Sequence, residues 1–582
     1  MKMTAGRALV QVLHSWDVKH IYGIPGSSVN GLMDALYHEK EKVEYIQVRH
    51  EAAGAMAAAG YGKFSGKIGV CFGSAAPGGS NLLNGLYDAK MDRVPLLAII
   101  GQTATKNMNT NYFQEMDEIP LYADVSVYNR NASTAEQIPD MIEEAIRTAY
   151  VKKGVSVVIL PNDLVEKEIE FFPRKEEKKV PEKRRFSMEK EKIAMALEMI
   201  TKAERPVIYG GLGLKGAREI VEQVSEKFAM PIVTSAPSIG VAASGNHKNF
   251  MGSFGRLGTK PAYEIMNHAD MVLFIGSNFP FARFWPKELQ VIQVNNDPAD
   301  IGKQIPVDMG IVADGKEFLE ELLKTQEHRE ETSFLRAGRE NKKNWDNWLQ
   351  AIAGNDEEGL SAEAVIKAVG EASTQDAYYG LDVGNNTMYS VRMLPLYGKR
   401  QHSISGWFAT LGVGVPYSIA AKLEQPARQV WSISGDGGFA MNLQEIITQV
   451  RYELPIINIV LSNQSYGFIQ HAQIQSDFLY GVDITDADWA MVARGLGAIA
   501  FTVTNIQELN QVMEKIKELQ QSGNKKPILV DAKLAYSDPV DTSYMILDPE
   551  KYSAEKIEEY QKKYNLFGQP AFSTLLKKEE EK

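Results

Sequence analysis

The stretch Ser434-Gly435-Asp436-Gly437-Gly438 follows an apolar run at 429–433, and Asn463 follows the next apolar run at 456–461, 27 positions beyond Asp436. Such runs predict neighbouring strands of a parallel sheet, and open α/β sheets bind ligands at the carboxyl ends of their strands. Glycines let the backbone approach a diphosphate, while the Asp436 carboxylate and the Asn463 carbonyl suit Mg²⁺. A Gly-Asp-Gly segment alone is more often only a turn, but together with Asn463 it favours a diphosphate and magnesium site.

The same alternation of short apolar runs and helix-like stretches continues through the rest of the chain. It predicts an α/β protein with three consecutive parallel-sheet domains. The predicted strands lie at 43–48, 68–72, 94–100 and 155–160, then at 206–209, 231–234, 271–275 and 291–294, and finally at 377–383, 429–434, 456–461 and 528–531. Helices are expected at 51–64 and 135–152.

Charged and polar segments divide the three blocks. The segment 173–185 is dense in charge and cannot bury an apolar face, so it predicts an exposed linker. The polar region 326–355 predicts a helical connector, and the chain turns polar again beyond residue 537. The predicted order is a first domain at 1–173, a linker at 174–188, a central domain at 189–325, a connector at 326–359, a third domain at 360–537 and a polar tail at 538–582.

Composition narrows the class of protein. With 582 residues and a formal net charge of −11, the chain is biased against broad nucleic-acid binding, which needs clustered Lys and Arg. No apolar stretch approaches the roughly 20 residues of a membrane span, and the first residues lack the apolar core of a signal peptide. The single cysteine, Cys71, lies in an apolar run and fits a buried thiol in a reducing compartment. We therefore expect a cytoplasmic protein with no membrane and no nucleic-acid partner.

Five segments occur in the order seen in thiamine-diphosphate 2-oxo acid enzymes, which the chain resembles from about residue 5 to residue 531. These segments lie at 22–26, 49–51, 73–79, 84–89 and 435–438. In that family the first domain of one subunit binds the cofactor's pyrimidine, and the third domain of another binds its diphosphate. The resemblance implies thiamine diphosphate, Mg²⁺ and a homo-oligomer, with a dimer as the minimal active unit and a tetramer as the common assembly.

The resemblance also assigns residues to the cofactor. Glu51 would be the acid beside the pyrimidine nitrogen N1′, although alone it is an ordinary helix-start carboxylate. Leu411 would be the apolar wedge that bends the cofactor, with a plain core leucine as the alternative. The metal ligands would be Asp436, Asn463 and the backbone carbonyl of Ser465, although many relatives have a second Asn where this chain has Gln464. The other residues expected at this cofactor are Gly26, Pro77, Asp382, Gly384, Asn385, Ala409, Gly437, Gly438, Tyr466, Gly467 and Ile469.

The central block carries a Gly-x-Gly-x-x-Gly pattern at 211–216. The acidic residue expected about 20 positions later is missing, so the residues alone leave a nucleotide site and a non-binding spacer both open. The block is similar, however, to the FAD domain of the pyruvate oxidases within the same family, and the run at 276–281 carries most of that similarity. The FAD contacts that this implies are Gly211, Gly213, Ser253, Arg256, Gly276, Ser277, Asn278, Phe279, Asn296, Asp297 and Ile301.

The catalytic pocket is assigned by resemblance as well. Phe113 and Gln114 match a pair that lines it, Phe468 and Ile469 match residues between thiazolium and flavin, and Ser28 lies in the loop after the first motif. Surface glutamine and core phenylalanine are the alternatives for these types. The chain departs from many relatives in two places. It reads Gln470-His471-Ala472 where a glutamate is frequent shortly after the Phe468-Ile469 pair, and it reads Gly26-Ser27-Ser28 where a second glycine is frequent.

The implied activity is oxidation of pyruvate with phosphate and O₂ to acetyl phosphate, CO₂ and H₂O₂. One alternative is a quinone-reducing oxidase, which uses an amphipathic carboxyl-terminal segment, whereas 551–563 is almost wholly polar here. A second is an acetolactate synthase-type carboligase with structural FAD. A third is a non-catalytic nucleotide-binding protein on the same fold.

Overall fold

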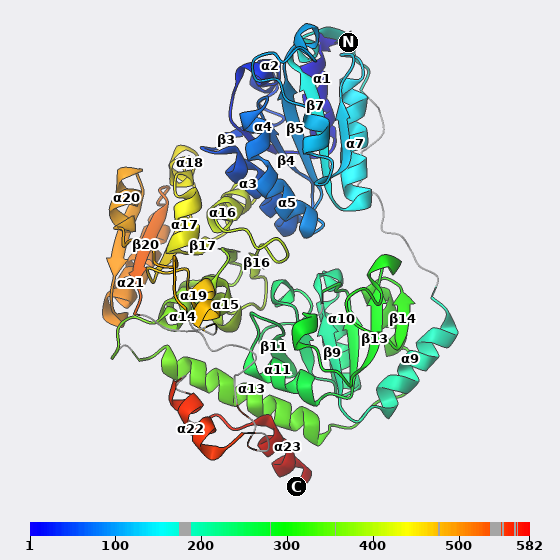
Figure 1. Ribbon diagram of the computed structural model, residues 1–582, viewed down its shortest axis with the longest axis vertical. Coiled ribbons are helices and arrows are strands. Elements are labelled where there is room, and N and C mark those ends of the chain that lie inside the picture. The colour runs from blue at the N-terminus through cyan, green and yellow to red at the C-terminus, as the bar shows by residue number, and fades with distance from the viewer. Residues whose placement is uncertain are drawn as a thin grey trace.

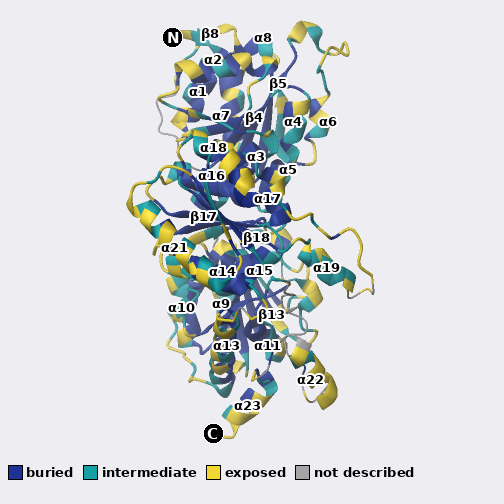
Figure 2. Ribbon diagram, turned by 90° about the vertical axis from the view of Figure 1, so that its left-hand side faces the viewer, coloured by how far each residue is buried: buried dark blue, intermediate teal, exposed yellow. Residues whose placement is uncertain are grey.

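The computed structural model describes residues 1–173, 188–279, 281–355, 357–474, 476, 478–535, 547, 549, 552–563, 566 and 568–582. The linker expected at 174–188 lies almost wholly outside these residues, as do Pro280 and much of the segment between 536 and 551. Three six-stranded parallel sheets follow one another along the chain, which confirms the predicted α/β class (Figure 1). Most of their inner strands are buried and dark blue in Figure 2, because helices cover both faces.

The N-terminal domain holds a sheet of order β3-β2-β4-β5-β7-β6. All four predicted strands are confirmed to within two residues at each end, and β2 and β6 are additional. A short antiparallel pair, β1 with β8, ties the domain's first residues to its last. The elements are β1 (Lys2–Thr4), α1 (Ala5–Ser15), β2 (His20–Gly23), α2 (Asn30–His38), β3 (Glu44–Gln47), α3 (Glu51–Ser65), β4 (Gly69–Gly73), α4 (Pro77–Asn81), α5 (Leu83–Met91), β5 (Leu96–Gln102), α6 (Glu118–Leu121), β6 (Ser126–Asn131), α7 (Ile138–Lys152), β7 (Val155–Pro161), α8 (Asn162–Val165) and β8 (Glu168–Glu170).

The central domain holds a sheet of order β11-β10-β9-β12-β13-β14. Its four predicted strands are the inner ones, and both edge strands, β11 and β14, escaped prediction. The elements are α9 (Lys190–Lys202), β9 (Pro206–Gly210), α10 (Arg218–Lys227), β10 (Ile232–Thr234), β11 (Phe250–Ser253), α11 (Lys260–His268), β12 (Met271–Ile275), β13 (Gln290–Asn295), β14 (Met309–Val312), α12 (Gly315–Leu323) and the connector helix α13 (Ser333–Ile352).

The C-terminal domain holds a sheet of order β16-β15-β17-β18-β20-β19, and again the unpredicted strands are the two edges. The elements are α14 (Ala362–Ala372), β15 (Tyr378–Leu381), α15 (Asn385–Met393), β16 (Gln401–Ser403), α16 (Gly414–Glu424), β17 (Val430–Gly435), α17 (Asp436–Asn442), α18 (Glu445–Arg451), β18 (Ile457–Ser462), α19 (Gly467–Ile474), α20 (Trp489–Gly495), β19 (Ile499–Val503), α21 (Ile506–Gln521), β20 (Ile528–Lys533), α22 (Ala554–Lys563) and α23 (Phe572–Glu580).

The end of the chain is not only polar. Helix α23 packs on α13, where Phe572 is fully buried against Phe334 and His268. The Phe572 amide also donates to the Glu264 carboxylate of α11 at 3.2 Å. The last helix therefore belongs to the core of the central region. Among the described residues, no helix has both the length and the apolar composition that crossing a bilayer requires.

Helices α3 and α16 join the N-terminal domain to the C-terminal domain. Helix α3 is rich in Ala and Gly, and it ends at Gly66, whose φ of 76° is the left-handed cap that glycine favours. The small side chains let α16 approach closely: a Cβ on Gly60 would lie 2.5 Å from the Tyr417 ring. This packing fixes where the loops at the ends of the two helices meet.

Candidate active site

The carboxyl ends of β17 and β18 bring Asp436 and Asn463 to one edge of the C-terminal sheet, as predicted. The two strands pair in parallel, and the Gln464 amide donates to Asp436 Oδ2 at 2.7 Å. The Gly437 amide donates to Asp436 Oδ1 at 2.9 Å. Burial raises the pKa of Asp436, and a cation beside it would restore its charged form.

Glycines keep this edge open to a ligand. A Cβ on Gly437 would lie 2.6 Å from the Tyr466 ring, and one on Gly438 would lie 2.9 Å from the Asp382 carboxyl carbon. A Cβ on Gly467 would lie 2.5 Å from Asn385 Nδ2. Larger residues at these three positions would therefore clash with the side chains around them, so only glycine permits this close packing at the starts of α17 and α19.

The donor set fits Mg²⁺ and a diphosphate. One carboxylate, one amide carbonyl and a backbone carbonyl are hard oxygen donors, and Mg²⁺ commonly takes few protein ligands and completes its shell with phosphate and water. Among the described residues, no three His, Cys, Asp or Glu side chains gather to hold a metal, which agrees with so sparse a set. The buried Asn385 Oδ1 beside this edge has no hydrogen-bond partner among the residues that the structure describes, and such an atom needs a ligand or water.

Asp382 anchors the loop that carries Leu411. Its Oδ1 accepts from the Val383 and Gly412 amides at 2.8 Å each, and its Oδ2 accepts from Ser434 Oγ at 3.0 Å. Next to it, Gly384 has a φ of 129°, a conformation that other residues rarely adopt. These contacts bring Asp382, Gly384 and Leu411 to the same edge as Asp436.

Glu51 stands at the first position of α3, where β3 ends. Its Oε2 accepts from Asn81 Nδ2 at 3.0 Å, and a Cβ on Gly78 would lie 3.2 Å from its Oε1. The C-terminal domain holds the residues before it, because Glu445 Oε1 accepts from the Arg49 amide at 2.9 Å and from the following amide at 3.2 Å. Sequence reasoning missed Asn81 and Glu445, whose roles depend on contacts between distant segments.

The turn before Pro77 lies beside Glu51 and is strained. Ala76 has φ 54° and ψ −99°, a region that L-residues rarely occupy. Ser28 supports this turn, because its buried Oγ accepts from the Ala75 amide at 2.7 Å. Gly26 also lies here, since a Cβ would lie 2.7 Å from Ser74 Oγ. The structure thus places Ser28 and Gly26 at the base of the turn rather than at its exposed surface.

Phe113 and Gln114 occupy a loop that projects beyond β5. Glu115 stabilises this loop through hydrogen bonds to its backbone. Its carboxylate accepts from the Asn109 amide, from the Thr110 amide at 3.2 Å and from the Tyr112 amide at 2.9 Å. Phe113 is 79% exposed, so the described part of the chain leaves most of this residue open to solvent.

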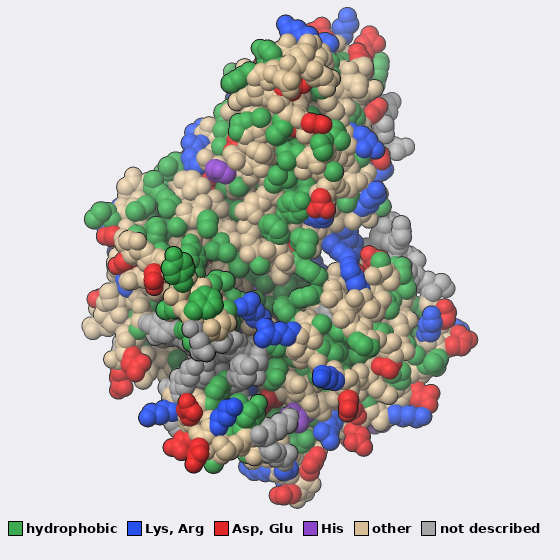
Figure 3. Space-filling model, in the orientation of Figure 1, with side chains coloured by type: hydrophobic (Ala, Val, Ile, Leu, Met, Phe, Trp, Pro, Cys, Tyr) green, Lys and Arg blue, Asp and Glu red, His purple; other side chains and the backbone are tan. Residues whose placement is uncertain are grey.

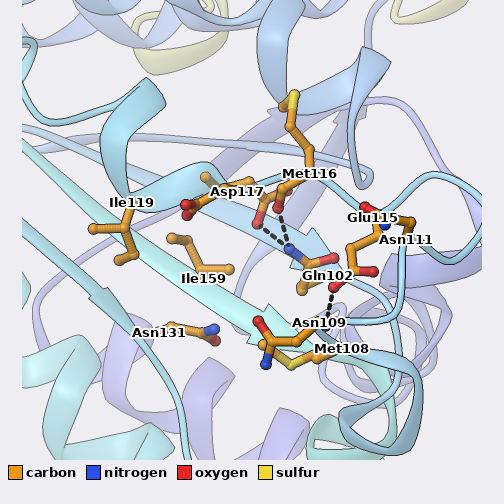
Figure 4. A pocket seen from close by; sticks show the side chains of 11 residues that line it. Gln102, Met108, Asn109, Asn111, Glu115, Met116, Asp117, Ile119, Asn131 and Ile159 are labelled. Atoms are coloured by element: carbon orange, nitrogen blue, oxygen red, sulfur yellow. Dashed lines mark hydrogen bonds between the residues drawn. The ribbon is translucent and has the colours of Figure 1, made fainter.

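A cavity of about 390 Å³ lies beneath this loop, lined by Gln102, Met116 and Asp117 among others (Figure 4). Gln102 Nε2 donates to the Met116 carbonyl at 2.9 Å and to Glu118 Oε2 at 3.0 Å. Burial raises the pKa of Glu118 to about 8, and the Ala76 amide and Gln102 oppose this shift. Sequence reasoning missed Glu118, which links the cavity to the strained turn.

Helix α19 presents an apolar surface. Tyr466 and Ile469 are 37% and 52% exposed, and Figure 3 shows hydrophobic side chains gathered around this helix. Ser465 Oγ donates to Gln470 Oε1 at 2.6 Å, at the base of the helix. The Phe468 ring lies 4.0 Å from the Arg256 guanidinium of the central domain, within cation–π range.

The glycines of the central domain have a structural use that the sequence pattern did not indicate. The Gly211 and Gly213 amides donate to the Ile275 and Gly276 carbonyls at 2.9 and 2.8 Å, so both point to the neighbouring strand end. A Cβ on Gly211 would lie 2.3 Å from the Gly276 carbonyl oxygen. These three glycines thus permit close packing of two loops above β9 and β12.

The other residues expected at FAD surround the same carboxyl-terminal edge. Asn295 Nδ2 donates to the Ser277 carbonyl at 3.1 Å, and Phe279 packs on Trp407 of the C-terminal domain with ring centroids 4.5 Å apart. Asp297 caps the short turn before Ile301. Ser253 is the last residue of β11, Asn278 lies on the segment after β12, and Asn296 follows β13.

Comparison with known proteins agrees with this geometry. Models of the thiamine pyrophosphate enzymes match in three parts: the N-terminal TPP binding domain at 3–121, the central domain at 193–322 and the C-terminal TPP binding domain at 382–532. Thiamine pyrophosphate is another name for thiamine diphosphate.

Curated relatives match over nearly the whole chain. A pyruvate oxidase of Lactiplantibacillus plantarum is 41% identical over 98% of this chain and 95% of its own length. A putative thiamine pyrophosphate-containing protein of Bacillus subtilis is 37% identical over 92% of each chain. An acetolactate synthase large subunit of Corynebacterium glutamicum is 30% identical over 91% of this chain and 86% of its own length. The chain therefore belongs to the thiamine pyrophosphate enzymes.

Proposed function

We propose that this protein is a pyruvate oxidase that uses thiamine diphosphate, Mg²⁺ and FAD, and that converts pyruvate, phosphate and O₂ to acetyl phosphate, CO₂ and H₂O₂. The observation that carries this proposal is the contact of Arg256 with Phe468 at 4.0 Å. It sets the proposed flavin domain against the first turn of α19, beside the diphosphate edge. Electron transfer from the substrate adduct to FAD requires that the two cofactor sites lie close together, whereas a domain that serves only as a spacer has no need of this contact.

The domains then divide the work. Residues 1–173 would bind the pyrimidine, residues 189–325 would bind FAD, and residues 360–537 would bind the diphosphate and Mg²⁺. When bound, thiamine diphosphate supplies the carbanion chemistry of decarboxylation and FAD accepts two electrons. The chain's own residues would bind, orient and exchange protons.

Glu51 would hold a proton at the pyrimidine nitrogen N1′. Its hydrogen bond from Asn81 leaves Oε1 beside Gly78, where the absence of a side chain gives the ring room to approach. Asp436, Asn463 and the Ser465 carbonyl would hold Mg²⁺. Gln114 would donate to the bound substrate, while Phe113, Phe468 and Ile469 would exclude water from it.

The site would be completed by a second copy of the chain. Phe113 at 79% exposure and Ile469 at 52% leave the two apolar parts of the proposed pocket open to solvent in a single chain. We propose a homo-oligomer, at least a dimer and as a full assembly a tetramer, in which Glu51 and Asp436 of different chains serve one cofactor. We also propose a cytoplasmic location.

Mixing two inactive variants tests this arrangement. Glu51→Gln and Asp436→Ala protomers, dissociated and reassembled together, should regain about a quarter of wild-type activity, since half of the dimers are hybrids with one intact site each. Either variant reassembled alone is the control. Mixtures that stay inactive although hybrids form would place both residues in one chain's site.

The activity itself is tested by oxygen uptake with pyruvate, thiamine diphosphate, Mg²⁺ and FAD, with and without phosphate. Phosphate-dependent uptake with an equal amount of peroxide and acetyl phosphate is the expected result. Oxygen uptake that does not depend on phosphate would favour acetate as the product and would contradict the proposal that acetyl phosphate is formed.

A carboligase is the second candidate, because an acetolactate synthase subunit matches at 30% identity. Acetolactate formed from pyruvate without oxygen uptake would support it. A quinone-reducing oxidase has less support, because the described helix α22 has the polar sequence AEKIEEYQKK.

A further inference from the structure

A buried ionic cluster lies where the N-terminal domain meets the C-terminal domain. Lys63 of α3 donates from Nζ to Asp88 Oδ1 at 2.8 Å and to Asp92 Oδ2 at 2.6 Å. The same Nζ lies 2.7 Å from the Tyr417 hydroxyl of α16. The Lys63, Asp88 and Asp92 side chains are 9%, 0% and 10% exposed. We call Lys63, Asp88, Asp92 and Tyr417 the interdomain cluster.

The cluster places one ammonium group beside two carboxyl groups. Burial alone would lower the pKa of Lys63, but the two carboxyl groups outweigh it, so the pKa is raised and Lys63 stays charged. Burial raises the pKa of Asp92, and the neighbouring Asp88 adds to this shift. The Tyr417 hydroxyl donates to Asp88, as does Ser405 Oγ at 2.6 Å.

Asp92 receives its remaining hydrogen bonds from the loop at 404–412. The Gly406 amide donates to Asp92 Oδ2 and the Trp407 amide donates to Asp92 Oδ1, at 3.1 Å each. These bonds span 314 and 315 positions of the sequence and join two domains. Hydrogen bonds to a buried carboxylate are stronger than those between neutral groups, so they restrain the backbone of this loop firmly.

The same loop is also held by the central domain and by the rest of its own domain. Trp407 packs on Phe279 of the central domain, and the Gly412 amide donates to Asp382. Between these anchors Ala409 has a φ of 56°, a left-handed conformation that persists only when its surroundings impose it. Ala409 and Leu411 are the residues proposed to hold the cofactor's aminopyrimidine.

We propose that Asp92 is a positioning residue for the aminopyrimidine of thiamine diphosphate. Through the Gly406 and Trp407 amides it holds the start of the loop, and Asp382 holds its end, so that Ala409 and Leu411 present a preformed seat for the ring. This inference rests on the proposed function, since it requires that the loop meets that cofactor. In this arrangement a residue of the N-terminal domain, Asp92, positions the loop of the C-terminal domain that meets the pyrimidine ring.

The test compares two ligands on purified apoprotein with saturating Mg²⁺. One is thiamine diphosphate, and the other is thiazole diphosphate, which keeps the thiazole and diphosphate but lacks the pyrimidine. The variants are Asp92→Ala, which removes both acceptors, and Asp92→Asn, which keeps one oxygen. The control is Asp17→Asn, because Asp17 is 64% exposed and its φ of 59° is one that asparagine accepts.

We expect Asp92→Ala to weaken thiamine diphosphate binding by about tenfold to a hundredfold and thiazole diphosphate binding by no more than about twofold. Asp92→Asn should lose less affinity than Asp92→Ala, and again more for thiamine diphosphate than for thiazole diphosphate. This variant decides the test if Asp92→Ala does not fold. Asp17→Asn should match the wild type for both ligands. The split between the ligands is the signature of positioning, because a general loss of structure would weaken both.

Equal losses for both ligands, or wild-type affinity for thiamine diphosphate in a folded Asp92→Ala variant, would overturn the assignment. Failure of the proposed function looks different. A protein that does not use thiamine diphosphate would bind neither ligand as the wild type, and a carboligase would bind both but take up no oxygen with pyruvate.

Discussion

Glu118 provides a prediction that the sequence alone did not offer. Its side chain is 2% exposed, and burial raises its pKa to about 8. The folded protein therefore binds a proton at neutral pH that the unfolded chain, with an ordinary glutamate, releases. Because the folded-state pKa lies above the unfolded one, the folded state loses stability as pH rises from about 4.5 to about 8.

The magnitude follows from the width of this window. Each pKa unit is worth about 1.4 kcal/mol, so the loss approaches about 3 kcal/mol at pH 7 and has a ceiling of about 5 kcal/mol above pH 8. Glu118→Gln imitates the protonated acid and can still accept from Gln102. The variant should equal the wild type near pH 4.5 and exceed it in stability increasingly as pH rises.

Urea unfolding of the apoprotein at several pH values, approached from both the folded and the unfolded side, measures this difference. The control is Glu168→Gln, which neutralises an exposed glutamate of β8 in the same domain. Parallel pH profiles for wild type and Glu118→Gln would refute the reasoning, because they would mean that Glu118 is ionised in the folded protein.

Three further changes test the site. Glu51→Gln should lower the rate of pyruvate decarboxylation by about a hundredfold or more, the usual scale for an acid–base group, while thiamine diphosphate still binds; near wild-type turnover would reject the role of Glu51. Asp436→Ala should abolish Mg²⁺-dependent thiamine diphosphate binding in a titration that leaves FAD content unchanged, and retained Mg²⁺ dependence would exclude Asp436 as a ligand. Arg256→Ala should slow flavin reduction by pyruvate in stopped-flow absorbance by about tenfold, because a cation–π contact of about 0.5–2 kcal/mol holds the two domains together there; an unchanged rate would remove the argument drawn from that contact.

The sequence predicted the inner strands well, with the exception of β2, and the reason is physical. Strand β5 is buried along its whole length, and a strand covered on both faces appears as a continuous apolar run. The edge strands β11, β14, β16 and β19 are short, contain glycine or are partly exposed. Strands β11, β14 and β16 are too short to give a distinct apolar run, whereas β19, with the sequence IAFTV, has the composition of a strand and was overlooked.

The residues of the site also fall into those that local sequence predicts and those that it does not. Asp436 and Asn463 follow apolar runs directly, so the strand ends predicted where they lie. Asp92 and Glu118 act on segments that only folding brings near, and no local pattern marks them. For Gly211 and Gly213 the local pattern left a nucleotide site and a non-binding spacer both open. The structure adds that both amides bond the segment at 275–276, and their contact with FAD stays a prediction.

Anaerobic mixing of the FAD- and thiamine diphosphate-loaded protein with pyruvate, followed by the visible absorbance of the flavin, tests the proposed oxidation most directly. We expect bleaching of one flavin per chain, and recovery of the oxidised spectrum with release of H₂O₂ when oxygen is admitted. A flavin that stays oxidised while CO₂ and acetolactate accumulate would contradict it and leave FAD a structural role.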